Sequence, residues 1–164
     1  MTEEVLRAHY TRVADESQLP VILYNIPKYM HFALSAELVA ELAQHRNVVG
    51  IKDSSGQLDM LKGFLRAQSP TFNVLTGSGS GLQAGLEAGA RGGILAVSLF
   101  AAGFALEVLR GVQSGDAAAA AKAQARLKPM ADVIVAKLGV PGVKAAMDAV
   151  GKVGGVPRMP LLPL

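Results

Sequence analysis

Short apolar runs alternate with longer amphipathic stretches along much of this chain. Four runs are mainly apolar, do not alternate with polar residues and have the length of buried strands: Val21–Tyr24, Val48–Lys52, Phe72–Leu75 and Ile94–Val97. The stretches that follow them carry apolar residues at helical spacing. Non-alternating strands that are each followed by a helix are typical of parallel sheets, so the pattern predicts an α/β fold built from βα repeats.

Helices are predicted between these runs and through the rest of the chain. Thr2 is followed by two glutamates and is expected to cap a first helix that ends near Ser17. Ser35 is expected to start a second helix, with a hydrophobic staple around it. The remaining helices are predicted over residues 58–67, 82–90 and most of 101–151, with a bend at Pro129 and a break at 140–143 before a last helix from Lys144.

Composition narrows the class of protein. The 164 residues suit one ordinary domain, and a hydrophobic content of 51% supplies ample core. The absence of cysteine excludes a disulfide scaffold, a cysteine zinc site and a thiol nucleophile. No apolar stretch reaches the roughly 18 residues of a spanning helix, so we expect a cytoplasmic protein that binds no membrane. The net charge of +3 comes from scattered residues, which argues against nucleic-acid binding.

The chemistry of the chain centres on Lys52, which ends an apolar run just before the polar turn Asp53-Ser54-Ser55-Gly56. The carboxyl ends of strands are where α/β barrels carry their active sites. Desolvation at such a position disfavours the charged amine, and a neutral amine can attack a ketone. Lys52 is therefore the first candidate nucleophile, although the residue by itself leaves open a snorkelling lysine with a solvated head group.

Four motifs around this lysine carry a family resemblance. They are residues 24–27 (YNIP), 50–56 (GIKDSSG), 75–78 (LTGS) and 90–94 (ARGGI). In this order and spacing the chain resembles the dihydrodipicolinate synthase / N-acetylneuraminate lyase family of class I, pyruvate-type aldolases. The resemblance covers essentially the whole chain.

The resemblance implies a partial (β/α)8 TIM barrel, containing strands five to eight, followed by C-terminal helices. Residues 1–110 would form the C-terminal half of the barrel, and residues 111–164 a helical extension. A complete eight-stranded barrel takes about 250 residues. We therefore expect the chain to be a fragment, a mis-started reading frame or a true half-barrel.

The resemblance also assigns roles to individual residues. Lys52 would form a Schiff base with the substrate, and Tyr24 would be its general acid/base, although Tyr24 alone is also compatible with a core aromatic. Ser54 would contact the substrate, or would simply form a turn. The backbone of Gly77 would form part of the pocket wall, and the backbone of Leu95 would face the pyruvyl carboxylate.

Two departures from the family pattern bear on the substrate. The lysine-pathway synthases carry an arginine where this chain has Tyr29, so a semialdehyde carboxylate would lose a bidentate partner. The sialic-acid lyases carry an acidic pair where this chain has Gly79 and Ser80. What remains resembles aldolases of 2-keto-3-deoxy sugar acids or of 4-hydroxy-2-oxoglutarate. Dihydrodipicolinate synthase proper is the alternative.

The expected partner is a small 2-oxo acid, held covalently through Lys52 without a further cofactor. No metal is expected, because the histidines are too far apart in sequence to suggest a ligand cluster: His9, His31 and His45. A half-barrel exposes unpaired strand edges, so we expect a homo-oligomer or association with a missing N-terminal half. A non-catalytic, degenerate half-barrel that serves as an interaction module is the alternative from another class of function.

Overall fold

The structure, a computed structural model, describes residues 2–164 and divides into two compact units. The first, here called the sheet unit, comprises the chain up to residue 77 together with residues 85–94. The second, the helical unit, comprises residues 78–84 and 95–164. Residue 110, after which a domain boundary is expected, lies within a helix of the helical unit, and that boundary stays a prediction.

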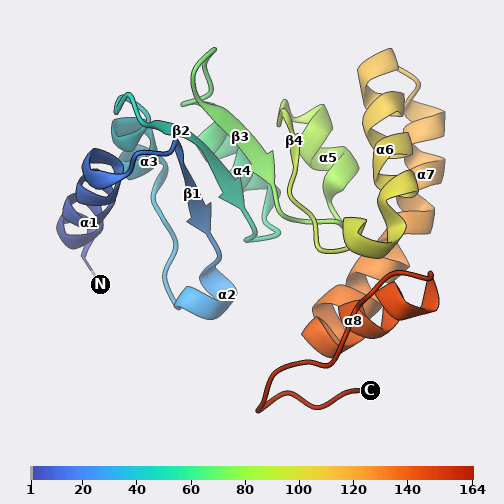
Figure 1. Cartoon of the computed structure of the whole chain (residues 1–164). Helices are drawn as coiled ribbons and strands as arrows, with labels where there is room; N and C mark the ends of the chain where they lie inside the picture. Colours follow the sequence, from blue (N-terminus) through green and yellow to red (C-terminus); the bar gives the residue numbers. More distant parts are fainter. Residues whose placement is uncertain (1) are drawn as a thin grey trace. The chain divides into compact units, whose positions relative to one another are not determined.

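The sheet unit is built on four strands: β1 (Val21–Asn25), β2 (Val48–Asp53), β3 (Asn73–Thr76) and β4 (Gly92–Gly93). They are parallel and hydrogen-bonded in chain order, and the arrowheads of β1, β2 and β3 point the same way in Figure 1. The register places Tyr24 opposite Lys52, and Lys52 opposite Leu75. The predicted α/β fold with a parallel sheet is therefore confirmed.

Helices cover one face of this sheet. Apolar side chains of α1 (Glu3–Glu16), α3 (Ala36–Leu42) and α4 (Leu58–Leu65) form a core with strand residues. The strand residues in this core include Leu23, Ile51 and Val74, which are at most 1% exposed. Successive side chains of a strand point to opposite faces, and accordingly Ile22 and Tyr24 are 46% and 43% exposed. The pleat thus separates a packed face from a face whose side chains remain accessible.

The helix starts predicted at Thr2 and Ser35 agree with the structure. The hydroxyl of Thr2 accepts a hydrogen bond from the amide of Val5, and that of Ser35 accepts one from the amide of Leu38. Both are therefore N-caps, of α1 and α3. The structure adds one short helix, α2 (Pro27–Met30), that the sequence prediction missed. Its proline stands at the first helical position, where a fixed φ favours a helix start.

The fourth strand differs most from its prediction, which placed it at Ile94–Val97. The structure instead pairs the two preceding glycines with β3, and the amide of Ile94 adds one bond of 2.9 Å to the carbonyl of Thr76. The chain then turns, because the carbonyl of Leu95 accepts from the amide of Ser98 at the start of α6 (Ser98–Ser114). The helix start therefore uses backbone groups that a longer strand would need.

The helical unit contains α6, α7 (Ala117–Pro129), a π-helix η1 (Met130–Lys137) and α8 (Gly139–Ala149). The short helix α5 (Leu82–Glu87) starts in the helical unit and ends in the sheet unit. Asp116 caps α7 by accepting the amide of Ala119 at 2.9 Å. At Pro129 the chain changes from α-helix to π-helix. The predicted break at 140–143 is wrong, because α8 already begins at Gly139. Pro141 is tolerated there since the first turn of a helix leaves its amides without intrahelical partners.

The contact between α6 and α7 gives a stability prediction. A Cβ on Gly111 would lie 2.7 Å from the amide nitrogen of Ala120, so the two backbones approach closely. We expect Gly111→Ala to lower the free energy of unfolding by about 1–3 kcal/mol, because α7 must move. Gly103→Ala on the same helix meets nothing within 4 Å and should be neutral or stabilising by up to about 1 kcal/mol. Urea unfolding compares the two variants, and equal stabilities would contradict this packing.

Candidate active site

The candidate nucleophile and the candidate acid/base lie side by side at the ends of β1 and β2. Tyr24 and Lys52 are register partners, and the Nζ of Lys52 lies 4.1 Å from the centroid of the Tyr24 ring. A cation at this distance over an aromatic face is attracted by the ring quadrupole. Within residues 2–164 the Nζ takes part in no ion pair. The amine is thus held by the ring rather than neutralised by a carboxylate.

A polar network lies on the opposite side of the same strand ends. The side-chain amide of Asn25 donates to Oδ1 of Asp53 at 2.8 Å, and its oxygen accepts from the backbone amide of Leu34 at 3.0 Å. Asp53 also accepts from the amide of Ser55 at 3.0 Å and from its hydroxyl at 2.7 Å. Asn25 and Asp53 are only 1% and 2% exposed. Buried polar groups that are fully paired fix local geometry, so this network ties β1 to β2 and to the turn that follows.

Sequence reasoning missed the Asn25–Asp53 pair. Each residue directly follows a predicted site residue, Tyr24 or Lys52, and this adjacency was the signal in the sequence. Side chains alternate across a strand, so Asn25 and Asp53 lie on one face of the sheet and Tyr24 and Lys52 on the other. The pair therefore acts on the candidate site through the backbone.

Removal of Asn25 tests the strength of this network. Asn25→Ala would leave the amide of Leu34 without its acceptor and would take one donor from Asp53. We expect the free energy of unfolding to fall by about 1–3 kcal/mol, the cost of a buried unpaired polar group. Asn73→Ala is the matched control, because the side-chain amide of Asn73 makes a single hydrogen bond to the described residues, a long one of 3.4 Å to the carbonyl of Val49. Chemical denaturation measures both, and an Asn25→Ala loss no larger than that of the control would contradict the role of the network.

Ser54 and Gly77 meet beside this network. The amide of Ser54 donates to the carbonyl of Asn25 at 2.8 Å, and the amide of Gly77 donates to the carbonyl of Asp53 at 2.6 Å. A Cβ on Gly77 would lie 2.0 Å from Oγ of Ser54 and 3.0 Å from its Cβ. Only glycine fits against Ser54 in this arrangement. The structure thus brings four predicted site residues to adjacent strand ends of the sheet unit.

Leu95, the fifth predicted site residue, belongs to the helical unit. It lies outside any strand, and its carbonyl accepts the amide of Ser98 at 3.1 Å. The role of its backbone toward a substrate carboxylate stays a prediction.

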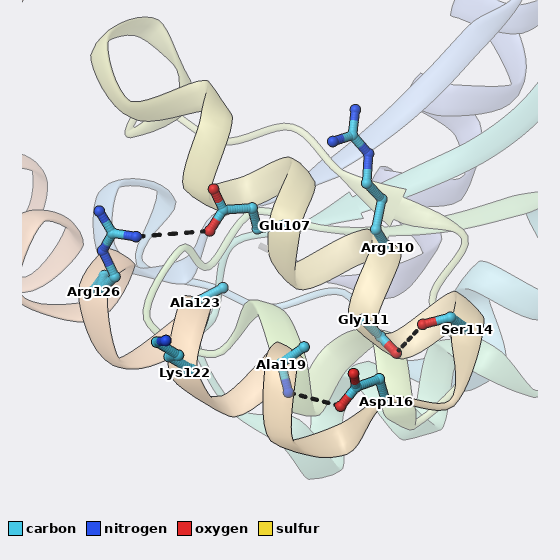
Figure 2. Close-up of a pocket in the computed structure, with 9 residues that line it drawn as sticks. All are labelled: Glu107, Arg110, Gly111, Ser114, Asp116, Ala119, Lys122, Ala123 and Arg126. Carbon is cyan, nitrogen blue, oxygen red and sulfur yellow. Dashed lines mark hydrogen bonds and ion pairs between the residues drawn. The ribbon is translucent and has the colours of Figure 1, made fainter.

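A cavity of about 420 Å³ lies between α6 and α7, within the helical unit (Figure 2). Arg126 and Glu107 face one another across it at 3.9 Å, and Asp116 is occupied as the cap of α7. None of the predicted site residues lines this cavity. The candidate site therefore rests on side-chain chemistry at the strand ends.

The described residues offer no cluster for a metal ion, since no three His, Asp or Glu side chains among them are placed to share one. The histidines contact other groups: His45 lies 3.0 Å from Asp15, and His9 packs edge-on against Tyr10. Function without a metal stays a prediction. No helix within residues 2–164 is both long and apolar enough to cross a membrane.

Comparison with known proteins identifies relatives along the full chain. The model of the dihydrodipicolinate synthetase family matches residues 1–164. The 4-hydroxy-tetrahydrodipicolinate synthase of Stenotrophomonas maltophilia is 36% identical over 164 residues, and that of Exiguobacterium sp. is 32% identical over 163. Each alignment covers 99% of this chain but only 54% and 56% of the relatives. The chain thus spans about half the length of these relatives.

Solved structures agree with these relatives. Dihydrodipicolinate synthase from Bacillus anthracis superposes with a TM-score of 0.93 at 28% identity, covering 100% of this chain and 56% of that one. The enzyme from Acinetobacter baumannii, solved in complex with pyruvate, gives a TM-score of 0.91 at 28% identity, with coverages of 100% and 56%. The fold of this chain is therefore similar to that of about half of each of these chains.

Proposed function

This chain belongs to the dihydrodipicolinate synthetase family, and we propose that it carries the Schiff-base half of a class I aldolase site for pyruvate or a related 2-oxo acid. The observation that carries the proposal is the Lys52–Tyr24 pair, with Nζ 4.1 Å from the ring centroid at the carboxyl ends of two adjacent parallel strands. In this reading the four strands correspond to strands five to eight of a TIM barrel, whose catalytic groups lie at the carboxyl end. The pyruvate complex of the Acinetobacter baumannii relative supports the choice of ligand.

The proposed chemistry begins at Nζ of Lys52. The neutral amine adds to the C2 carbonyl of the 2-oxo acid to form a carbinolamine. Its hydroxyl group takes up a proton and leaves as water, which gives a protonated imine. The positive nitrogen accepts the electron pair released when the C3–C4 bond of a 4-hydroxy-2-oxo acid breaks. The products are an enamine at C3 and a free aldehyde, and the 4-hydroxyl proton leaves as the bond breaks.

Tyr24 is placed to move that proton. Its phenol can accept the proton of the aldol hydroxyl during cleavage and return one during condensation, as a general acid/base. Ser54 would contact the substrate through its hydroxyl, and Gly77 would let the backbone approach it closely. In this proposal Asn25 and Asp53 hold the backbone of both catalytic residues without touching the substrate.

The proposed substrate follows from two positions where this chain has uncharged residues and other members of the family have charged ones. Tyr29, which stands where an arginine would meet a semialdehyde carboxylate, lies on α2 and is 66% exposed. Gly79 and Ser80 stand in place of an acidic pair. We therefore favour a 2-keto-3-deoxy sugar acid or 4-hydroxy-2-oxoglutarate as substrate of the aldolase. The alternative, dihydrodipicolinate synthase proper, is favoured by the names of the matching relatives.

The polypeptide of these 164 residues is expected to be a poor aldolase when it is tested alone. It spans about half of its relatives, and the family resemblance assigns the groups that bind the pyruvate carboxylate to the other half. Loss of one preorganised donor already costs about 10²–10³ in rate. We expect pyruvate release at least about 10²-fold slower than by a full-length relative. A coupled lactate dehydrogenase assay measures this, and release at the rate of the relative would contradict it.

Association is the expected consequence of the strand edges. Within the described residues β1 and β4 each pair on one side only. Open parallel edges favour pairing with another chain. We propose self-association or binding of a complementary barrel half, and light scattering that finds a clean monomer would contradict self-association.

Schiff-base formation can be tested without turnover. The folded chain is incubated with pyruvate and sodium borohydride, which reduces an imine to a stable amine, and its intact mass is measured. We expect one reduced pyruvate adduct per folded chain, and much slower labelling of the same chain in denaturant, where the lysine side chains are retained but the site is not. Equal labelling of folded and unfolded chains would contradict the proposed function.

A further inference from the structure

The buried side-chain amide of Asn25 has a sulfur atom as a further partner. One hydrogen of Nδ2 is donated to Asp53, and Nδ2 also donates to Sδ of Met60 at 3.2 Å. The orientation of the amide is set by its oxygen, which accepts the backbone amide of Leu34 and therefore turns Nδ2 toward Asp53 and Met60. Asn25 thus links the strand ends of the sheet unit to the first turn of α4, where Met60 lies.

Met60 is the more accessible member of this contact. Asn25 and Asp53 are 1% and 2% exposed, whereas Met60 is partly exposed and packs at the margin of the apolar core of the sheet unit. The chain contains no cysteine, so its oxidisable sulfur atoms are all in methionines. An oxidant that reaches Met60 therefore acts on a sulfur in direct contact with the buried polar network.

Hydroperoxides are oxidants of the kind that convert a thioether to a sulfoxide. A lone pair of Sδ attacks one oxygen of hydrogen peroxide, an S–O bond forms and the O–O bond breaks. The departing hydroxide takes the proton of the new S–OH group and leaves as water. Sulfur loses two electrons, the peroxide gains two, and an apolar side chain becomes a polar one.

The added oxygen does not fit the present contact. A hydrogen bond from an amide nitrogen to an oxygen is about 2.9 Å long. Because Sδ itself lies only 3.2 Å from Nδ2 of Asn25, a sulfoxide oxygen that accepts this hydrogen requires the sulfur to move away. An oxygen that points elsewhere enters the apolar core beside α4, where an unpaired polar atom is costly. Either arrangement displaces Met60 from Asn25.

We propose that Met60 is an oxidation site through which a hydroperoxide reversibly lowers the reactivity of Lys52 toward 2-oxo acids. The inference rests on the proposed function. Asn25 and Asp53 hold the backbone that carries Tyr24 and Lys52, so a shift of the Asn25 amide is transmitted to the catalytic pair. A misplacement of about 1 Å can cost about 10² in rate. Methionine sulfoxide reductases regenerate the thioether, which makes the effect reversible.

The experiment measures the rate of borohydride trapping with pyruvate before and after oxidation. The folded chain is treated with hydrogen peroxide, and the peroxide is removed by catalase and desalting before pyruvate is added, because peroxide destroys 2-oxo acids. Peptide mapping then locates the sulfoxides. We expect trapping on the oxidised parent chain to be at least about tenfold slower. Incubation with methionine sulfoxide reductases of both epimer specificities is expected to restore the rate.

Two variants separate Met60 from the other methionines. Met60→Leu keeps an apolar side chain of similar volume and removes the oxidisable sulfur, so its trapping rate should be the same before and after peroxide. Met30→Leu is the matched control, because it removes a methionine of α2 that is 48% exposed. This variant should lose its rate on oxidation as the parent chain does.

Several outcomes would overturn this inference alone. Equal losses in the parent chain and Met60→Leu would do so, as would an undiminished rate in a parent chain whose Met60 is fully oxidised. Resistance of Met60 to peroxide that oxidises Met30, unfolding of the oxidised chain by circular dichroism, or no recovery once the Met60 sulfoxide has been reduced would also contradict it. Failure of the untreated parent chain to form any adduct would instead overturn the proposed function.

Discussion

Replacing Lys52 by arginine is expected to abolish the pyruvate adduct that borohydride traps on the folded chain. Arginine keeps the positive charge and a long stem over the Tyr24 ring, where Nζ now lies 4.1 Å from the centroid. Its guanidinium is always protonated in proteins and cannot attack a carbonyl. Lys52→Arg thus removes the nucleophile while it preserves charge and much of the packing, and intact-mass measurement after trapping gives the result directly.

Lys62→Arg is the matched control for this substitution. Lys62 lies in the last turn of α4 and is exposed, so the same change there should leave the adduct unchanged. Retention of the adduct in Lys52→Arg, or its loss in Lys62→Arg, would contradict the assignment of the nucleophile. Circular dichroism of both variants shows that the comparison is made between folded chains.

Replacing Tyr24 by phenylalanine is expected to slow adduct formation by at least about 10²-fold without changing the lysine that is labelled. The aromatic ring that contacts Nζ of Lys52 remains, and only the phenol is lost. Imine formation needs proton transfers to and from the carbinolamine, and a positioned general acid/base contributes about 10²–10⁴ in rate. The time course of trapping at fixed pyruvate concentration measures the effect.

Tyr29→Phe provides the corresponding control, because Tyr29 is 66% exposed on α2 and contacts Lys28 rather than Lys52. Its trapping rate should match that of the parent chain. A Tyr24→Phe rate equal to that of Tyr29→Phe would show that the phenol of Tyr24 moves no proton in this step.

The arrangement of the parallel strands was predictable because local signals agreed with one another. Apolar runs at Val21 and Val48 ended in polar residues, and each was followed by a helical pattern, the first of them with Ser35 as its cap. Since parallel strands end at the same edge, the proximity of Tyr24 and Lys52 followed from their places at the ends of neighbouring strands. The structure then supplied their register, which no spacing in the sequence specifies.

The features that sequence reasoning missed depend on competition between neighbouring elements. Ile94–Val97 has the composition of a strand, yet its backbone is divided between one last ladder bond and the start of α6. The partner of Asn25 could not be chosen in advance, because Asp53 becomes its neighbour only through the register of β1 and β2. The side-chain amide of Gln124, on α7, donates a hydrogen bond to the carbonyl of Gly79. These residues are far apart in sequence, so no local pattern predicts the bond.

The central claim, that Lys52 is a Schiff-base nucleophile, is tested most directly by locating the trapped adduct. The parent chain is reduced with borohydride in the presence of pyruvate, digested, and mapped by tandem mass spectrometry. We predict a single labelled position, Lys52. An adduct on other lysines, or none in a sample shown to be folded, would contradict it.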